Sequence, residues 1–115
     1  MNIEKYLEQN YKNIDIDILV DLFFKQENFY TLIYYQSMPK KNEYLIQEID
    51  NDMVGLIFTS KEKLEQYKKE EPLIKNWIIK EYKTNDFEKY FQDVNKNISG
   101  ICINYPFYWC KLMLQ

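Results

Sequence analysis

The chain has 115 residues, a length at which folding buries about 65% of the surface that the unfolded chain exposes, so we expect one core and a single domain over residues 1–115. Hydrophobic residues make up 46% and charged residues 29% of the chain, a balance that excludes intrinsic disorder and a membrane-spanning protein. The net charge is -3, with no Arg and no basic cluster. Nucleic-acid binding is therefore disfavoured, because its affinity depends on neutralising phosphates.

The first residues, Met1 to Tyr6, lack the basic segment and the apolar run of a signal peptide, and no stretch approaches the roughly 18 apolar residues of a membrane span. Cys102 and Cys110 match neither a redox pair nor half of a zinc site. We therefore expect unpaired thiols and a soluble protein of the reducing cytoplasm.

Two helices are predicted at the start of the chain. Apolar residues recur at helical spacing over residues 3–11, and Asn2 is placed to accept the first free backbone N–H groups. Asp15 or Asp17 is expected to cap a second helix that ends near Gln26. Its predicted apolar stripe consists of Ile18, Leu19, Leu22 and Phe23.

Three strands are predicted next. Residues 29–35 are aromatic or β-branched on both faces, so this strand is expected to lie centrally or to be covered on both sides; left uncovered, it would mark a dimer seam. Residues 37–42 break the pattern, and residues 43–49 form the second strand. A turn at 50–52 leads into the third strand, over residues 53–58.

Helices and strands then alternate. Thr59 is expected to cap a helix over residues 60–69, with Glu62 reaching back to complete a capping box. A strand over 73–82 and a helix from about Asp86 to Val94 follow. The last predicted strand covers residues 101–104; Pro106 ends its pairing, and residues 107–114 complete the chain.

This order of elements predicts an α+β fold. Two N-terminal helices precede a mixed or antiparallel sheet of about five strands, on which two further helices pack.

The segment 54–67, VGLIFTSKEKLEQY, resembles the signature of the SseB-like N-terminal domain, in which a strand ending in Phe-Thr-Ser runs into a helix. The segment 98–106, ISGICINYP, is similar to the closing strand of that family, except that Tyr105 separates Asn104 from Pro106. The resemblance covers residues 15–106. It implies the family's α+β scaffold and a role as an accessory or regulatory protein of a bacterial secretion system.

The chain lacks the residues that most enzymatic mechanisms require. The chain has no His, which excludes the usual acid–base and nucleophilic mechanisms. It also has no Arg and no Gly-rich loop, which phosphoryl transfer usually requires. The pairs Asp15/Asp17, Asp50/Asp52 and Glu70/Glu71 suit turns and helix caps better than a metal or glycosidase site. Cys102, between two Ile residues of a predicted strand, has the setting of an inert thiol. We predict no metal, no cofactor and no enzymatic activity; an enzyme that uses carboxylates alone is the minor alternative.

Two candidate binding surfaces follow from the side-chain types. The first is an acidic set in loops on either side of the third strand and its helix: Asp50, Asp52, Glu70 and Glu71. Its alternative, which we favour, is a solvated rim. The second is an aromatic C-terminal set whose side chains suit interface anchors: Tyr105, Phe107, Tyr108 and Trp109. Its alternative, which we favour, is packing in the core.

These observations favour a non-catalytic protein-binding module. Its most concrete form is an immunity-type protein that neutralises a toxin by covering the toxin's active site, because an acidic chain suits a basic toxin domain through electrostatic steering. The SseB-like accessory role is the alternative. The expected partner is another protein, with no nucleic acid and no membrane; the sequence leaves the oligomeric state open.

Overall fold

The computed structural model describes residues 1–37, 40–94 and 98–114, and it confirms the predicted α+β class. The helices in this part of the chain are α1 (Ile3–Asn10), α2 (Ile16–Lys25), α3 (Lys61–Glu70) and α4 (Phe87–Val94), with short 3-10 turns η1 (Pro72–Ile74) and η2 (Thr84–Asp86). The strands are β1 (Asn28–Ser37), β2 (Lys40–Tyr44), β3 (Ile46–Ile49), β4 (Asp52–Ile57), β5 (Ile78–Lys83), β6 (Gly100–Ile103) and β7 (Cys110–Met113).

These strands form two sheets, where the sequence predicts one sheet of about five strands. The first has the order β2-β1-β5 and is antiparallel throughout. The second has the order β3-β4-β6-β7, in which β4 and β6 run parallel and the other pairs antiparallel. The central position predicted for the strand at 29–35 is confirmed, since β1 lies between β2 and β5.

Leu45 is the residue at which one sheet passes into the other. Its N–H donates to the carbonyl of Leu32 in β1 at 3.1 Å, and its own carbonyl accepts from the N–H of Leu56 in β4 at 3.1 Å. The segment predicted as one strand over 43–49 therefore pairs with β1 through its first half and with β4 through its second. A bend of this kind leaves the apolar pattern unchanged, so the sequence did not reveal it.

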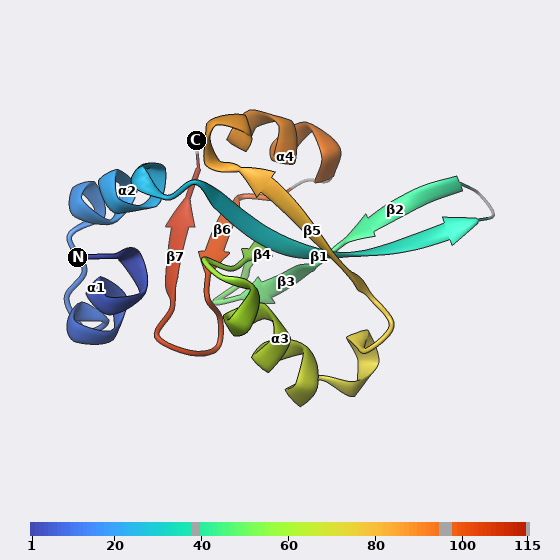
Figure 1. Cartoon of the computed structure of the whole chain (residues 1–115), viewed down its shortest axis with the longest axis horizontal. Coiled ribbons are helices and arrows are strands. Elements are labelled where there is room, and N and C mark those ends of the chain that lie inside the picture. Colours follow the sequence, from blue (N-terminus) through green and yellow to red (C-terminus); the bar gives the residue numbers. More distant parts are fainter. Residues whose placement is uncertain (38–39, 95–97, 115) are drawn as a thin grey trace.

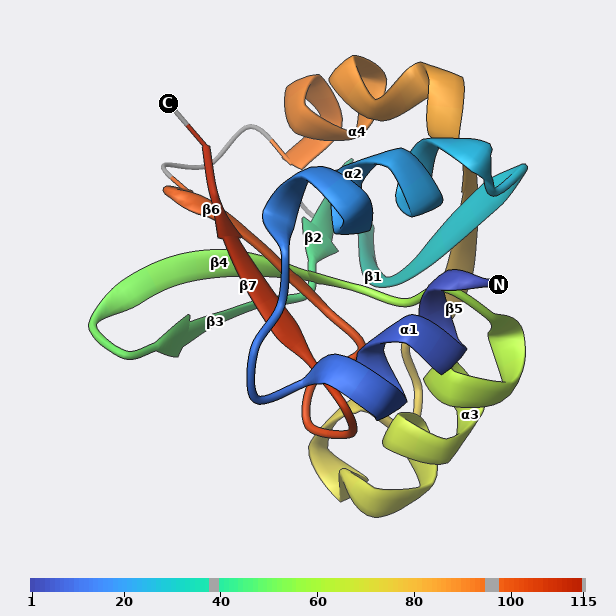
Figure 2. The same ribbon diagram turned by 90° about the vertical axis from the view of Figure 1, so that its left-hand side faces the viewer.

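Helices cover both faces of the strands (Figures 1 and 2). One core cluster unites side chains of α1, α2 and α4 with β1, β4 and β6, and Tyr90, Phe29 and Leu7 are fully buried within it. A second cluster packs α3 and η1 against the opposite faces of β1, β4 and β6. No helix among the described residues combines the length and apolarity needed to cross a membrane.

The predicted caps of the first two helices are confirmed. The Asn2 side chain accepts a hydrogen bond from the N–H of Lys5 at 2.8 Å, and the Asp15 side chain accepts from the second helix at 3.0 and 3.3 Å. The predicted stripe of α2 is only partly buried: Leu19 and Phe23 are in the core, whereas Ile18 is 47% exposed.

Two local predictions differ from the structure. The cap of α3 is Ser60, whose Oγ accepts from the N–H of Lys63 at 3.2 Å. The Thr59 cap is wrong because that side chain is held by other groups, described below. The strand predicted over 73–82 starts late: Pro72 begins the turn η1, and β5 begins only at Ile78.

The end of the chain also differs, because it returns to the sheet as β7, antiparallel to β6. Pro106 is predicted to end the pairing for the rest of the chain. In the structure it ends only β6, and pairing begins again with β7 after a six-residue loop at 104–109. Of the break predicted at 37–42, residues 38–39 lie outside the described part of the chain, and the rest is wrong: Ser37 ends β1, and residues 40–42 belong to β2, which pairs with β1.

A close contact between Gly55 and Tyr90 gives the first testable prediction. The Tyr90 hydroxyl is buried without a hydrogen-bond partner in the described part of the chain, and a Cβ added at Gly55 would overlap it. We expect Gly55→Ala to lower the free energy of unfolding by about 1–3 kcal/mol through overpacking. Tyr90→Phe should be neutral or stabilising by up to about 1 kcal/mol, because it removes an unpaired buried hydroxyl.

The double variant separates this contact from a general effect of position 55. In the Tyr90→Phe background the nearest ring carbon is 3.2 Å from the added Cβ, so Gly55→Ala should cost less there. Urea unfolding of the four proteins measures the coupling. If the changes that the two substitutions cause in the free energy of unfolding are strictly additive, the Tyr90 hydroxyl is not the reason for Gly at position 55.

Candidate functional site

The β6–β7 loop (residues 104–109) lies between α1 and α3 (Figure 1). A groove of about 780 Å³ opens on one side of the loop tip, lined by aromatic residues with Lys63 and Gln66 of α3. A depression of about 300 Å³ opens on the other side, lined by Glu4 and Glu8 of α1. Phe107 and Tyr108 of the loop, with Lys63 of α3, line both hollows. The loop tip therefore divides one α1–α3 cleft into an aromatic compartment and an acidic compartment.

Asn104 fixes the start of this loop. It is 2% exposed, has a φ of 63°, and donates its backbone N–H to the Ile57 carbonyl at 2.9 Å. Its side-chain Oδ1 accepts from the N–H of Thr59 at 2.9 Å, and its Nδ2 donates to Thr59 Oγ1 at 2.9 Å. Asn tolerates the left-handed backbone better than most residues, so a single residue provides both the turn and the hydrogen bonds.

The hydrogen-bond chain continues into α1. Thr59 Oγ1 donates to Glu4 Oε1 at 2.8 Å, so the ends of β4 and β6 and the first turn of α1 are linked through three side chains, those of Asn104, Thr59 and Glu4. This explains why Thr59 does not cap α3. It also places the Glu4 carboxylate at the wall of the acidic compartment.

The four C-terminal aromatic residues take two different roles. Tyr105, Phe107 and Trp109 are half-buried against the second core cluster, and the rings of Tyr105 and Trp109 meet edge to face at 5.3 Å. Tyr108 is 44% exposed, and its ring lies 5.0 Å from that of Tyr11. Core packing thus holds the loop, while Tyr108 stays available on the surface.

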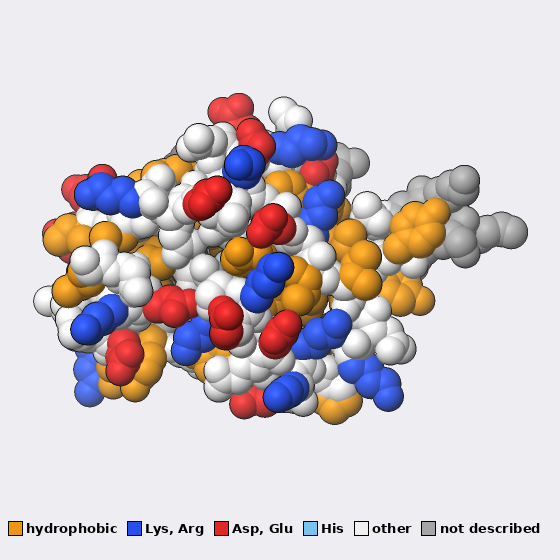
Figure 3. Space-filling view, in the orientation of Figure 1, with side chains coloured by type: hydrophobic (Ala, Val, Ile, Leu, Met, Phe, Trp, Pro, Cys, Tyr) orange, Lys and Arg blue, Asp and Glu red, His pale blue; other side chains and the backbone are white. Residues whose placement is uncertain are grey.

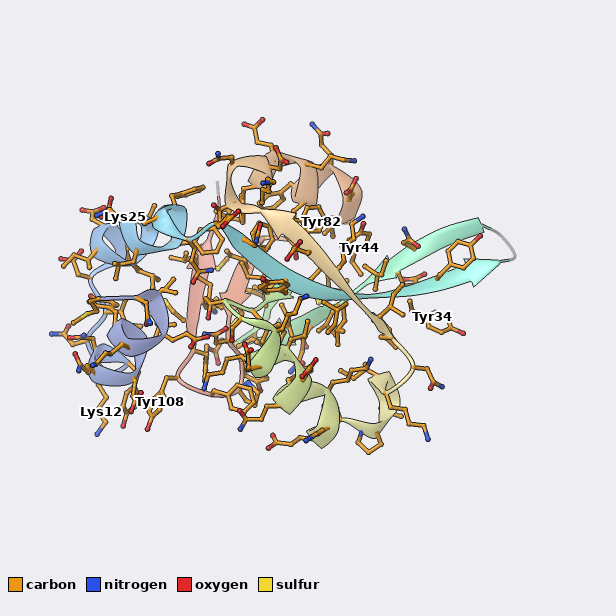
Figure 4. All side chains as sticks on the ribbon, in the orientation of Figure 1. Lys12, Lys25, Tyr34, Tyr44, Tyr82 and Tyr108 are labelled. Atoms are coloured by element: carbon orange, nitrogen blue, oxygen red, sulfur yellow. The ribbon has the colours of Figure 1, made fainter. Side chains whose placement is uncertain are left out.

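Two lysines lie against the aromatic rings of the cleft. Lys63 Nζ is 5.3 Å from the ring centroid of Phe107, and Lys12 Nζ is 5.7 Å from that of Tyr11. Figure 4 shows Lys12 and Tyr108 projecting from the same end of the molecule. Over the face seen in Figure 3, acidic and basic side chains alternate without a large patch of one sign.

The predicted acidic set does not form one surface. Asp50 and Asp52 belong to the β3–β4 hairpin, where the predicted turn is confirmed by the φ values of 53° at Asp50 and 69° at Asn51. Lys111 Nζ lies 3.0 Å from Asp52 Oδ2 and 3.8 Å from Asp50 Oδ2, and this hydrogen bond to Asp52 raises the pKa of Lys111. Both acids therefore tie the turn to β7.

Glu70 and Glu71 are exposed at the end of α3, and Figure 2 shows this helix well away from the β3–β4 turn. They line a depression of about 220 Å³ together with Tyr105. The structure therefore brings one half of the acidic set to the aromatic set, on the side of the β6–β7 loop opposite to Glu4 and Glu8.

The two thiols are buried, as predicted for Cys102. Burial raises the pKa of the Cys102 thiol to about 12 and also raises that of Cys110. Within residues 1–37, 40–94 and 98–114, no group of three or more His, Cys, Asp or Glu side chains is arranged to hold a metal ion.

Three residues of the cleft were not predicted from the sequence: Glu4, Glu8 and Tyr11. They recur at i, i+4 and i+7 and so share one face of α1, but a mixed face of this kind usually indicates solvated surface. No signal in the sequence places the β6–β7 loop against that face.

No protein-family model matches the chain, and its comparison with curated proteins and with solved structures gives no significant match. The SseB-like resemblance therefore stays a prediction.

The second prediction concerns Asn104. Asn104→Ala should lower the free energy of unfolding by about 2–4 kcal/mol, because it leaves the buried N–H of Thr59 unpaired and places Ala in the left-handed region. Asn104→Gly loses the same side-chain bonds but adopts the backbone freely, so it should cost about 1 kcal/mol less. Urea unfolding measures both. A smaller loss for Ala than for Gly would contradict the role of the backbone conformation.

The third prediction concerns Cys102 and alkaline pH. Because the pKa is higher in the folded protein than the ordinary value of 9.0, the unfolded chain loses the proton first as the pH rises. The contribution of the protonated Cys102 thiol to the free energy of unfolding is fully present below about pH 9. It is lost between about pH 9 and 12, at about 1 kcal/mol per pH unit. Urea unfolding across this range should show a shallower decline for Cys102→Ala than for the wild type. Equal slopes would refute the assignment.

Proposed function

We propose that the chain is a non-catalytic protein-binding module whose partner docks on the α1–α3 cleft. The observation that carries this proposal is the exposed pair Tyr11 and Tyr108 at the edge of a large groove whose other aromatic side chains are half-buried. Tyr and Trp supply much of the binding energy of protein interfaces, particularly in concave pockets.

The most concrete form of this function is an immunity-type protein that neutralises a toxin by covering the toxin's active site. The charge of the chain supports it: the net charge is -3, and Glu4 and Glu8 on one side of the β6–β7 loop are matched by Glu70 and Glu71 on the other. Acidic side chains around an aromatic centre steer a basic partner toward it and suit its charge once bound.

The rigidity of the loop is a further support. Asn104 holds the start of the loop by hydrogen bonds, and the half-buried rings of Tyr105 and Trp109 hold it before and after its tip. A surface that is ordered before binding loses less conformational entropy when the partner docks.

The experiment begins with the tagged chain, expressed in the cells from which it derives, and identifies the proteins that co-purify with it. We expect a partner that arrests growth when expressed alone and is harmless when co-expressed with the chain. Tyr11→Ala combined with Tyr108→Ala should weaken its binding by at least about tenfold, as expected for anchors at the centre of an interface.

Leu73→Ala is the matched control, since Leu73 is 89% exposed on η1 and does not line the cleft. It should bind the partner as the wild type does. A partner without toxicity would contradict the immunity role, and a partner whose affinity is unchanged by the Tyr11 and Tyr108 substitutions would contradict the site.

A further inference from the structure

The proposed function does not say which side chains of the partner the cleft recognises. The two compartments indicate them, in an inference that rests on the proposed function. We infer that the α1–α3 cleft binds an extended segment of the partner in which a Lys or Arg side chain enters the acidic compartment and a neighbouring aromatic or large aliphatic side chain enters the aromatic compartment.

The acidic compartment has an excess of negative charge, because Glu4 and Glu8 outnumber Lys63 among its described lining residues. Among the described residues, neither Glu4 nor Glu8 forms an ion pair. Glu4 accepts a hydrogen bond from Thr59 through Oε1, and Glu8 follows one helical turn later on the same face. Lys63, the cation that lines this compartment, lies over the ring of Phe107 instead.

The walls of the acidic compartment also suit a cation. Phe107 and Tyr108 line it beside the two carboxylates. A guanidinium or ammonium group bound there would meet carboxylate oxygens on the α1 side and the exposed ring of Tyr108 on the loop side, since Lys63 already lies over the ring of Phe107. Both contacts favour cations, the first by charge-assisted hydrogen bonds and the second by cation–π attraction.

The aromatic compartment suits an apolar anchor. Its volume of about 780 Å³ and its lining by Ile14, Phe107 and Trp109 give room for a large side chain against apolar surface. Tyr11 and Tyr108 stand at its edge with exposed rings. Its described lining residues include Lys63 and Lys111 and carry no carboxylate, so a basic side chain has its complement only in the neighbouring compartment.

The shared wall limits the spacing of the two anchors. Because Phe107 and Tyr108 line both compartments, the anchors lie on either side of one loop tip. An extended chain advances about 3.3 Å per residue, so a separation of about two to four residues spans such a tip. The chemistry therefore predicts a short linear motif, in which a basic and an aromatic residue stand close together.

The test uses defined peptides and the whole chain. The first peptide has about ten Gly and Ser residues with one Arg and one Trp about three residues apart, and its ends are capped. In otherwise identical peptides Arg is replaced by Gln or Glu, or Trp by Ala. Titration into ¹⁵N-labelled protein, followed by two-dimensional NMR, reports the affinity and which amides respond.

We expect the Arg–Trp peptide to shift the amide signals of α1 and of residues 104–109, and to bind about tenfold more tightly than the Glu–Trp and Arg–Ala peptides. Glu4→Gln combined with Glu8→Gln should remove the preference for Arg over Gln. Gln at position 4 keeps a carbonyl oxygen to accept from Thr59, so the fold should survive.

Asp86→Asn combined with Glu88→Gln is the matched control. It removes the same charge from exposed positions at the end of η2 and in the first turn of α4, on the opposite side of the molecule from the β6–β7 loop (Figure 1). This variant should keep the preference for Arg. If it loses the preference as the Glu4/Glu8 variant does, net charge and not the acidic compartment is responsible, and the inference is overturned.

Two further outcomes overturn the inference and leave the proposed function standing. In the first, no peptide shifts the cleft signals, although the natural partner binds and depends on Tyr108. In the second, the natural partner's affinity falls with the tyrosine substitutions but is unchanged by the Glu4→Gln and Glu8→Gln pair. Failure of the proposed function itself is recognised separately, by a partner that ignores Tyr11 and Tyr108.

Discussion

The hydrogen bonds between Asn104 and Thr59 are the interaction on which the architecture of the site depends. They join the ends of β4 and β6, the parallel pair at the centre of the second sheet, at a place where water is excluded. A buried backbone N–H must find a partner inside the protein, and the Asn104 side chain provides it for Thr59. The left-handed turn at Asn104 then starts the loop, and the Thr59 hydroxyl binds Glu4 of α1.

The aromatic side chains of the loop, whose start the Asn104 hydrogen bonds fix, form an ordered surface. Tyr105, Phe107 and Trp109 have part of each ring in the second core cluster, so they stabilise the fold and shape the groove together. Tyr108 extends beyond them to pair with Tyr11. Because α1 and α3 stand on either side, the same packing that orders the loop also creates the two compartments beside it.

Local features were predictable because their causes are local. Apolar residues at helical spacing and polar caps predicted α1 and α2, and Asn2 and Asp15 cap them as expected. The division into two sheets was not predictable, since the bend at Leu45 depends on hydrogen bonds to Leu32 and Leu56. Strand β7 was not predicted either, because it is defined by its pairing with β6 and follows a loop whose residues show no strand pattern.

For the site, the sequence by itself determined the residue types: aromatic anchors near the C-terminus, no His or Arg for the usual catalysis, and an excess of acid. Only the tertiary structure decided which of them meet. Asp50 and Asp52 pair with Lys111, whereas Glu4 and Glu8 come to face Tyr108 from the far end of the chain. The reason is physical: side-chain chemistry belongs to each residue, but proximity between distant segments arises from burial and from the buried hydrogen bonds of Asn104, which exist only when the chain is folded.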